Sequence, residues 1–182
     1  MIKRKNGLNY KNIKKYGKNP TKELSDKLIS ALPERLSHNS VIVDYGCGSG
    51  RFEGILLKFA KTLYCIDINK DVLMDVKSRF PSAITIEDTR TIPSSSVDFV
   101  LLANSFHDFD DKQAAVAEIN RVLRSTGRII VIDFEKMKTQ FGPPISIRMN
   151  KEDYLRYFYG FRIFREFKPA ESHYGLVIVR KG

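Results

Sequence analysis

The sequence of 182 residues lacks long apolar runs and has only two cysteines. Since no stretch approaches the roughly 20 apolar residues that cross a bilayer, we expect no membrane span. The N-terminal region is charged but has no apolar core of a secretory signal. Cys47 and Cys65 are not spaced as metal ligands. We therefore expect two buried thiols, no metal site and a cytoplasmic location.

Charge is unevenly distributed along the chain. The formal net charge is +10, and +7 of it lies in residues 1–27. Such a basic arm can attract RNA, an anionic membrane or an acidic substrate, although a solvated tail without a partner has the same composition. The length suits one domain. We divide the chain into a basic N-terminal arm and helix, residues 1–36, and a single domain, residues 37–182.

Segments that favour strands alternate with segments that favour helices. Apolar β-branched runs predict strands, and apolar residues at helical spacing predict helices. The predicted strands cover residues 41–43, 61–67, 83–87, 97–104, 127–134, 160–168 and 174–180. The predicted helices cover residues 20–32, 52–59, 70–79, 110–124 and 151–158. This alternation predicts an α/β fold with a doubly wound parallel sheet, and the last two strands predict an antiparallel hairpin at one edge.

The segment after the first predicted strand carries the strongest functional signal. Asp44 ends the strand, and glycines follow at alternate positions, Gly46, Gly48 and Gly50. A strand, a glycine turn and a helix form the cradle in which α/β folds bind an adenosine-containing ligand. Glycines allow backbone angles and a close ligand approach that a Cβ atom would block. The Asp44 carboxylate would repel a phosphate and attract an ammonium group.

A second acid, Asp67, ends the next predicted strand. It lies 17 residues after Gly50, close to the ~20-residue offset of an acid that binds a ribose. Its carboxylate can accept hydrogen bonds from both ribose hydroxyls. The alternative role for Asp67 is a helix cap, because Asn69 opens the next predicted helix.

The pattern Asp-x-Gly-x-Gly-x-Gly at residues 44–50 resembles the first motif of the class I S-adenosylmethionine-dependent methyltransferases. A dinucleotide site has Gly-x-Gly-x-x-Gly instead. The resemblance implies S-adenosylmethionine as the cofactor, with its methionine portion held by the backbone of the glycine loop. It also implies a seven-stranded sheet in the order 3-2-1-4-5-7-6, with the last strand antiparallel, in a single domain.

The same resemblance assigns further cofactor-binding residues. Asp67 would bind the ribose, and Ile68 would pack on the adenine. Asp88 and the backbone of Thr89 would bind the adenine amino group, although an Asx turn is the alternative role for Asp88. Asn104, at the end of the fourth predicted strand, is also assigned to the cofactor site.

The segment 104–108, Asn-Ser-Phe-His-Asp, bears on the methyl acceptor. It lacks the two prolines that methyltransferases of base nitrogens carry here, and it resembles the ubiquinone/menaquinone-biosynthesis and related type 11 small-molecule methyltransferases. His107 is predicted at the carboxyl edge of the sheet, where ligands bind. There it could act as a general base, or it could pack beside the cofactor. Asp110 and Asp111 are expected to cap the next helix rather than bind a metal.

These features predict S-adenosylmethionine-dependent methyl transfer to a small or medium organic acceptor, with His107 as the candidate catalytic residue. Residues 10–16 would form one wall of the acceptor pocket. The segment 135–150 would supply an apolar lid made of Phe141, Pro143, Pro144 and Ile145. Two alternatives stay open: an RNA-directed methyltransferase or RNA-binding protein that uses the basic arm, and an NAD-linked dehydrogenase. The glycine spacing and the terminal hairpin disfavour the dehydrogenase.

Overall fold

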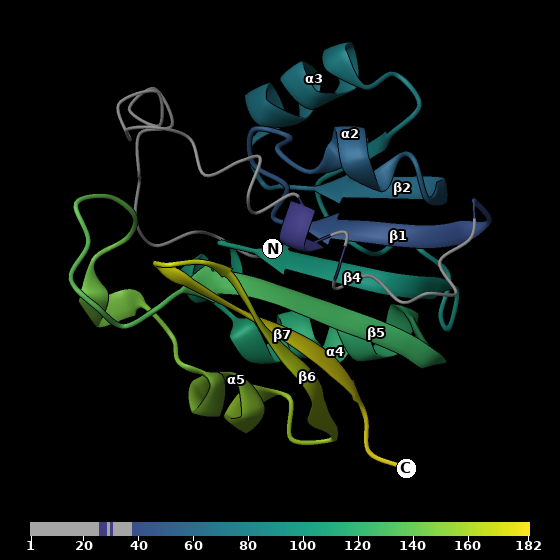
Figure 1. Cartoon of the computed structure of the whole chain (residues 1–182). Coiled ribbons are helices and arrows are strands. Elements are labelled where there is room, and N and C mark those ends of the chain that lie inside the picture. The colour runs from purple at the N-terminus through teal and green to yellow at the C-terminus, as the bar shows by residue number, and fades with distance from the viewer. Residues whose placement is uncertain (1–25, 29, 31–37) are drawn as a thin grey trace.

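The computed structural model describes residues 26–28, 30 and 38–182. Within this part, seven strands form one sheet in the order β3-β2-β1-β4-β5-β7-β6, which confirms the predicted order (Figure 1). Strands β1 to β5 run parallel, and β7 lies antiparallel to both β5 and β6. The predicted arm before residue 26, including the pocket wall at residues 10–16, lies outside the described residues.

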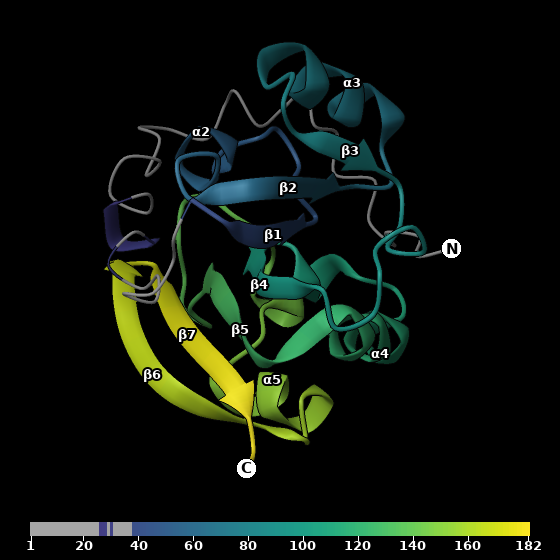
Figure 2. The ribbon, with the colours of Figure 1, turned by 90° about the vertical axis from the view of Figure 1, so that its right-hand side faces the viewer.

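The elements follow the predicted alternation of strands and helices. The strands are β1 (Ser40–Tyr45), β2 (Ala60–Ile66), β3 (Ile84–Ile86), β4 (Val97–Ala103), β5 (Leu123–Phe134), β6 (Phe161–Ala170) and β7 (His173–Arg180). The helices are α2 (Glu53–Leu56), α3 (Lys70–Arg79), α4 (Lys112–Val122) and α5 (Lys151–Tyr157), with 3-10 turns η2 (Phe106–Asp108) and η3 (Ile145–Ile147). Figure 2 follows the strands from β3 near the top to β6 at the lower left.

Two hydrophobic cores lie on opposite faces of the sheet. Along β5, Ile129 and Val131 pack in the core that α4 and α5 cover. Ile130 and Ile132 pack in the core that α2 and α3 cover. The near-continuous apolar run of β5 is therefore explained by burial on both faces, as expected of a strand inside a doubly wound sheet. Each such buried side chain contributes ~1.5–3 kcal/mol relative to exposure.

Two boundaries differ most from the prediction, and each has a packing reason. Helix α2 has a single turn because β2 already begins at Ala60, which leaves three residues after Leu56. Strand β5 begins at Leu123, because this residue pairs with Val97 of β4. Gly127 therefore lies inside the strand, where a Cβ atom would come within 2.6 Å of the Leu123 side chain.

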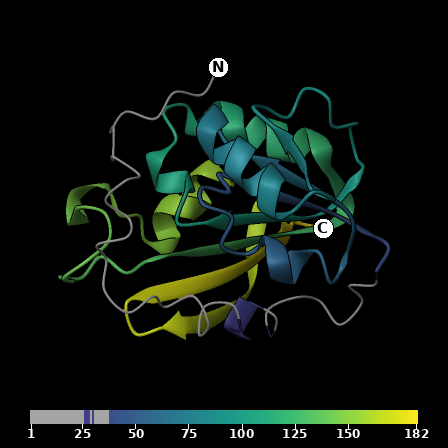
Figure 3. The ribbon, with the colours of Figure 1, turned by 90° about the horizontal axis from the view of Figure 1, so that it is seen from above.

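The parallel strands place their carboxyl ends at one edge of the sheet, where ligands bind in folds of this kind. The segments that follow β1, β2 and β4 carry the glycine loop, Asp67 and His107 respectively. The segment 135–150, which follows β5, projects beyond this edge in two views (Figures 1 and 3). The topology therefore gathers the predicted site residues in one region.

Candidate active site

The glycine loop after β1 has the backbone geometry that the sequence predicted. Gly46, Gly48 and Gly50 have φ angles of 84°, 53° and 70°, which L-residues with a Cβ atom rarely adopt. A Cβ at Gly50 would lie 2.8 Å from Arg79 and 2.9 Å from Val76, so helix α3 packs directly on this residue. A Cβ at Gly48 would meet only the Gly46 carbonyl, at 4.0 Å. The loop is thus held tightly at Gly50 and open at Gly48.

Two buried carboxyls, Asp44 and Glu53, face each other beneath this loop. Asp44 is 1% exposed and Glu53 is fully buried. Asp44 Oδ2 and both carboxyl oxygens of Glu53 find no donor among the described residues. Burial, followed by repulsion from Glu53 and Asp67, raises the pKa of Asp44. Without a bound ligand, one proton shared between the two carboxyls would satisfy the pair, because a hydrogen bond between two carboxyls requires that one of them be protonated. A cationic donor on a ligand would replace that proton.

The carboxylate of Asp67 ties the glycine loop to the end of β2. It accepts hydrogen bonds from the backbone N–H groups of Gly48, at 3.1 Å, and Asn69, at 3.0 Å. The cap of helix α3 is Asn69, whose side chain accepts from the N–H groups of Asp71 and Val72. The helix-cap alternative for Asp67 is therefore wrong, and Asp67 lies beside the loop.

The adenine-side residues differ in exposure. Ile68 is 39% exposed, which leaves an apolar surface beside Asp67. Asp88 accepts from the Arg90 N–H at 2.9 Å and pairs with its guanidinium at 2.6 Å, so the Asx turn that was the alternative role is present. Thr89 is buried, and its hydroxyl donates to Glu118 of helix α4.

Helix α4 anchors the segment after β3. Arg121 pairs with Glu118 at 2.8 Å. The same guanidinium donates to the carbonyls of Thr89 and Ile92, both at 2.9 Å. This segment is therefore fixed from the α4 side, and the backbone of Thr89 has a defined position.

Asn104 has a strained backbone at the end of β4. Its φ angle is 51°, and its side-chain Oδ1 is buried with no partner among the described residues. Backbone strain of this kind costs about 1–3 kcal/mol and concentrates at functional sites. Asn104 N donates to Ile132 O at 2.8 Å, which fixes the residue against β5. Asn104 Oδ1 and Asp44 Oδ2 are two unsatisfied acceptors at the carboxyl edge of the sheet.

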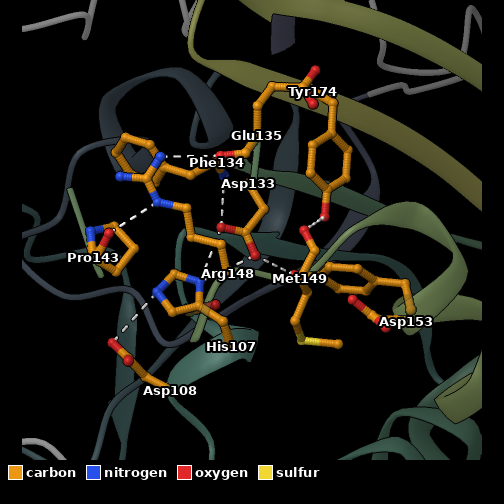
Figure 4. A network of polar contacts seen from close by, with 12 residues as sticks. His107, Asp108, Asp133, Phe134, Glu135, Pro143, Arg148, Met149, Asp153 and Tyr174 are labelled. Atoms are coloured by element: carbon orange, nitrogen blue, oxygen red, sulfur yellow. Dashed lines mark hydrogen bonds and ion pairs between the residues drawn. The ribbon is translucent and has the colours of Figure 1, made fainter. Parts of the chain in front are cut away.

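His107 belongs to a buried polar network that joins β5 and α5 (Figure 4). Its Nδ1 lies 2.9 Å from Asp133 Oδ1, and the Tyr154 hydroxyl donates to Asp133 Oδ2 at 2.6 Å. Asp133 is fully buried and also accepts from the N–H of Phe134. The sequence prediction missed Asp133 and Tyr154. A signal was present, because an acid that alternates with Ile129 and Val131 must point into an apolar core.

The net electrostatic environment favours the protonated form of His107. Burial lowers its pKa, whereas Asp133 and then Asp108 raise it, and the net pKa lies above its ordinary value. The His107 Nε2 atom lies 3.7 Å from Asp108 Oδ2, and Lys112 opposes these acids. His107 is therefore a titratable group whose charge depends on two carboxylates.

A cavity of about 650 Å³ opens beside His107. Its wall includes Asp108, Ile147, Met149 and Tyr157. The four predicted lid residues, Phe141, Pro143, Pro144 and Ile145, do not line it. The segment 135–150 still contributes to the wall, but through Lys136 and residues 146–149, and the cavity is more polar than the predicted apolar lid implied.

Arg148 explains why the predicted lid residues lie elsewhere. Its guanidinium donates to the carbonyls of Glu135, Met137 and Pro143 at 2.8–3.0 Å. It also lies over the Phe134 ring at 4.8 Å, and Phe141 packs on that ring at 5.9 Å. The segment therefore folds around Arg148, a buried cation whose role periodicity does not reveal.

The remaining predicted features are structural. Cys47 and Cys65 are both free and buried. Of the two predicted caps, Asp111 is the N-cap of α4 and accepts from the Ala114 N–H at 2.8 Å, whereas Asp110 lies one residue before the cap. In the described ranges, no three His, Cys, Asp or Glu side chains gather as a metal site, and no helix is long and apolar enough to span a bilayer.

Comparisons with known proteins agree with this fold. A family model described as "Methyltransferase domain" matches residues 43–131. A solved structure from Sulfolobus solfataricus, assigned to the type 11 methyltransferases, is 49% identical with a TM-score of 0.80, and the alignment covers 85% of this chain and 92% of that chain. The fold is that of the doubly wound α/β methyltransferases. The chain belongs to the type 11 methyltransferase family.

More distant relatives share the fold. A structure from Aquifex aeolicus, described as a SAM dependent methyltransferase, is 20% identical with a TM-score of 0.81, covering 94% of this chain and 98% of that chain. A protein of Bacillus thuringiensis described as an uncharacterized methyltransferase is 26% identical over 98 residues. That alignment covers 50% of this chain and 46% of the Bacillus protein, so the chain spans a little under half the length of this relative.

Proposed function

We propose that this protein uses S-adenosylmethionine to methylate a small or medium organic acceptor. The observation that carries the proposal is the pair of buried unsatisfied acceptors, Asp44 Oδ2 and Asn104 Oδ1, beside the positive-φ glycine loop. Buried polar atoms without partners are rare in folded proteins. An ammonium-bearing ligand at this edge would supply the missing donors, whereas a pyrophosphate would meet the acids Asp44 and Glu53. Family membership also argues against an NAD-linked dehydrogenase.

The residues present fit the cofactor. The open side of the glycine loop at Gly48 suits its methionine portion, and Asp67 suits the ribose hydroxyls. The exposed face of Ile68 suits the adenine ring. We assign the adenine amino group to the backbone of Thr89 and, with displacement of Arg90, to Asp88. When bound, this cofactor supplies a methyl group that its sulfonium already makes electrophilic.

The protein's own contribution is positioning and proton removal. Alignment of donor and acceptor can supply ~7–11 kcal/mol of barrier lowering. The cavity beside His107 is large enough for a small organic molecule, since ligand pockets have volumes of about 300–1,000 Å³. We assign His107 as the general base, because it lines this cavity and lies at the carboxyl edge of the sheet.

A transfer assay with methyl-labelled cofactor tests the acceptor class. Small phenolic, quinone-precursor and organic-acid acceptors are presented beside bulk RNA. We expect label in small molecules, and we expect His107→Gln to reduce turnover by roughly 10²–10⁴-fold with little change in cofactor affinity. Tyr159→Phe is the control, because Tyr159 is strongly exposed and lies outside the cavity wall. Label confined to RNA would instead favour the RNA-directed alternative.

A further inference from the structure

The carboxylate of Asp133 is the most enclosed charge of the network. Burial of an ionised carboxylate is costly unless donors replace its water. Here three donors converge on it: the Tyr154 hydroxyl, the Phe134 N–H and the His107 ring. The Tyr154 contact joins α5 to β5 through the core. A strand in this position needs only apolar side chains for stability, so the acid calls for a functional explanation.

We propose that Asp133 and Tyr154 are positioning residues that hold His107 with Nε2 available as a proton acceptor, and that the substrate is an acceptor that must lose a proton as it is methylated, such as a hydroxyl compound. The inference rests on the proposed function. The inference adds to the proposed function the tautomer of His107, the two residues that set this tautomer and the chemical class of the acceptor.

The tautomer follows from the chemistry of the partners. A carboxylate only accepts hydrogen bonds, and the Tyr154 hydroxyl already donates to it. The nitrogen of His107 that faces Asp133 must therefore carry a hydrogen. In the neutral ring, Nε2 is then the unprotonated nitrogen. The distance of 3.7 Å between Nε2 and Asp108 Oδ2 is longer than a hydrogen bond, so Asp108 does not occupy this nitrogen and Nε2 can accept a proton.

The step balances with His107 as the proton acceptor. The O–H bond of the acceptor breaks, and its proton passes to Nε2. The same oxygen forms the new bond to the methyl carbon, while the donor sulfur keeps the electron pair of the broken S–C bond. The resulting imidazolium is flanked by Asp133 on one side and Asp108 on the other. Acceptors that are already ionised at neutral pH would not need this arrangement.

Substitutions of the groups around His107 should shift its pKa in opposite directions. Asp133 of β5 and Asp108 of η2 favour the imidazolium, whereas Lys112 of α4 opposes it. The charge of Asp133 also acts on Arg148 and Tyr174, whose pKa values it raises. Removal of the Asp133 charge should make His107 less basic. Removal of the Tyr154 hydroxyl takes one donor from Asp133, concentrates its charge on His107 and should make His107 more basic.

Nuclear magnetic resonance of the histidine rings tests this without knowledge of the acceptor. The chain has three histidines, and His107→Gln assigns the relevant signals. We expect the neutral ring to carry its hydrogen on Nδ1. We expect Asp133→Asn to lower the pKa of His107, and Tyr154→Phe to raise it. Tyr157→Phe, the same change on the same helix, should leave it unchanged, because the Tyr157 hydroxyl is not among the donors to Asp133 in the described structure.

Three results would overturn the inference: a hydrogen on Nε2 of the neutral ring, shifts of the same sign in the two variants, or no shift in either. If Asp133→Asn does not fold, Tyr154→Phe alone still tests the inference, because the inference requires that this variant raise the pKa of His107. Calorimetry with S-adenosylhomocysteine tests the proposed function separately. Cofactor binding with unshifted histidine signals would remove the inference and leave the proposed function intact.

Discussion

Substitution of two glycines in the same loop should separate folding from ligand binding. At Gly50, alanine meets two costs. A φ angle of 70° costs about 1–3 kcal/mol for a residue with a Cβ atom, and overpacking against Val76, 2.9 Å away, costs about 1–3 kcal/mol more. Val76 is a β-branched side chain on a helix and cannot rotate away easily. We expect Gly50→Ala to lower the free energy of unfolding by roughly 2–6 kcal/mol.

Gly48→Ala is the matched change. Its φ angle of 53° brings the same backbone cost of about 1–3 kcal/mol, but the new Cβ meets only the Gly46 carbonyl, at 4.0 Å. The open side of Gly48 is the surface to which we assign the methionine portion of the cofactor. A methyl group there should therefore weaken binding of S-adenosylhomocysteine at least tenfold while stability falls less than in Gly50→Ala.

Chemical denaturation gives the two free energies of unfolding, and calorimetry at a temperature where both variants are folded gives the two affinities. The comparison matters more than either value, since both variants share the backbone cost. If Gly48→Ala destabilised the fold more than Gly50→Ala, or bound S-adenosylhomocysteine as tightly as the wild type, the assignment of Gly48 to the ligand side would be refuted.

The remaining predictions concern buried titratable groups. Burial lowers the pKa of His173 to about 4. Between pH 6.5, the ordinary pKa of histidine, and pH 4, the unfolded chain therefore binds a proton at His173 that the folded chain does not bind. The free energy of unfolding falls as the pH falls through this interval. The variant His173→Phe retains an aromatic ring against Phe134. In denaturation experiments, its free energy of unfolding should fall by about 3 kcal/mol less than that of the wild type between pH 6.5 and 4. The raised pKa of Asp44 has the opposite sign, because the folded chain holds a proton that the unfolded chain releases above 3.8. Glu53→Gln gives Asp44 an amide donor, so the variant should lose less stability than the wild type as pH rises from 4 to 8; an unchanged slope would show that the two carboxyls do not share a proton.

The sequence predicted the sheet because its strands are buried on both faces. Continuous β-branched runs such as 129–132 leave little ambiguity, and the hairpin after α5 lacks room for a crossover helix. The glycine loop was also predictable, because glycine is the residue that most readily adopts a positive φ angle, and three glycines at alternate positions after a strand therefore indicate a tight turn. Helix α2 was overestimated because Phe59 continues the helical spacing, whereas the start of β2 ends the helix earlier.

Side chains that work through distant partners were harder to predict. Asp133 and Tyr154 lie 21 residues apart and meet only because α5 packs on β5. Glu53 has the pattern of an ordinary acid in the first turn of a helix, and only the fold brings it against Asp44. His173 lies just before the predicted strand 174–180, but it begins β7 and is fully buried. Local pattern does not encode these tertiary contacts.

Calorimetric titration with S-adenosylhomocysteine, with NAD as the comparison ligand, tests the central claim most directly. The account predicts one site per chain for S-adenosylhomocysteine, with micromolar or tighter affinity, and none for NAD. Asp67→Ala should weaken binding at least tenfold, because hydrogen bonds to a charged acceptor contribute about 1.5–3 kcal/mol each, whereas Asp71→Ala on the exposed side of α3 should bind as the wild type does. Failure of the folded wild-type protein to bind S-adenosylhomocysteine would contradict the account.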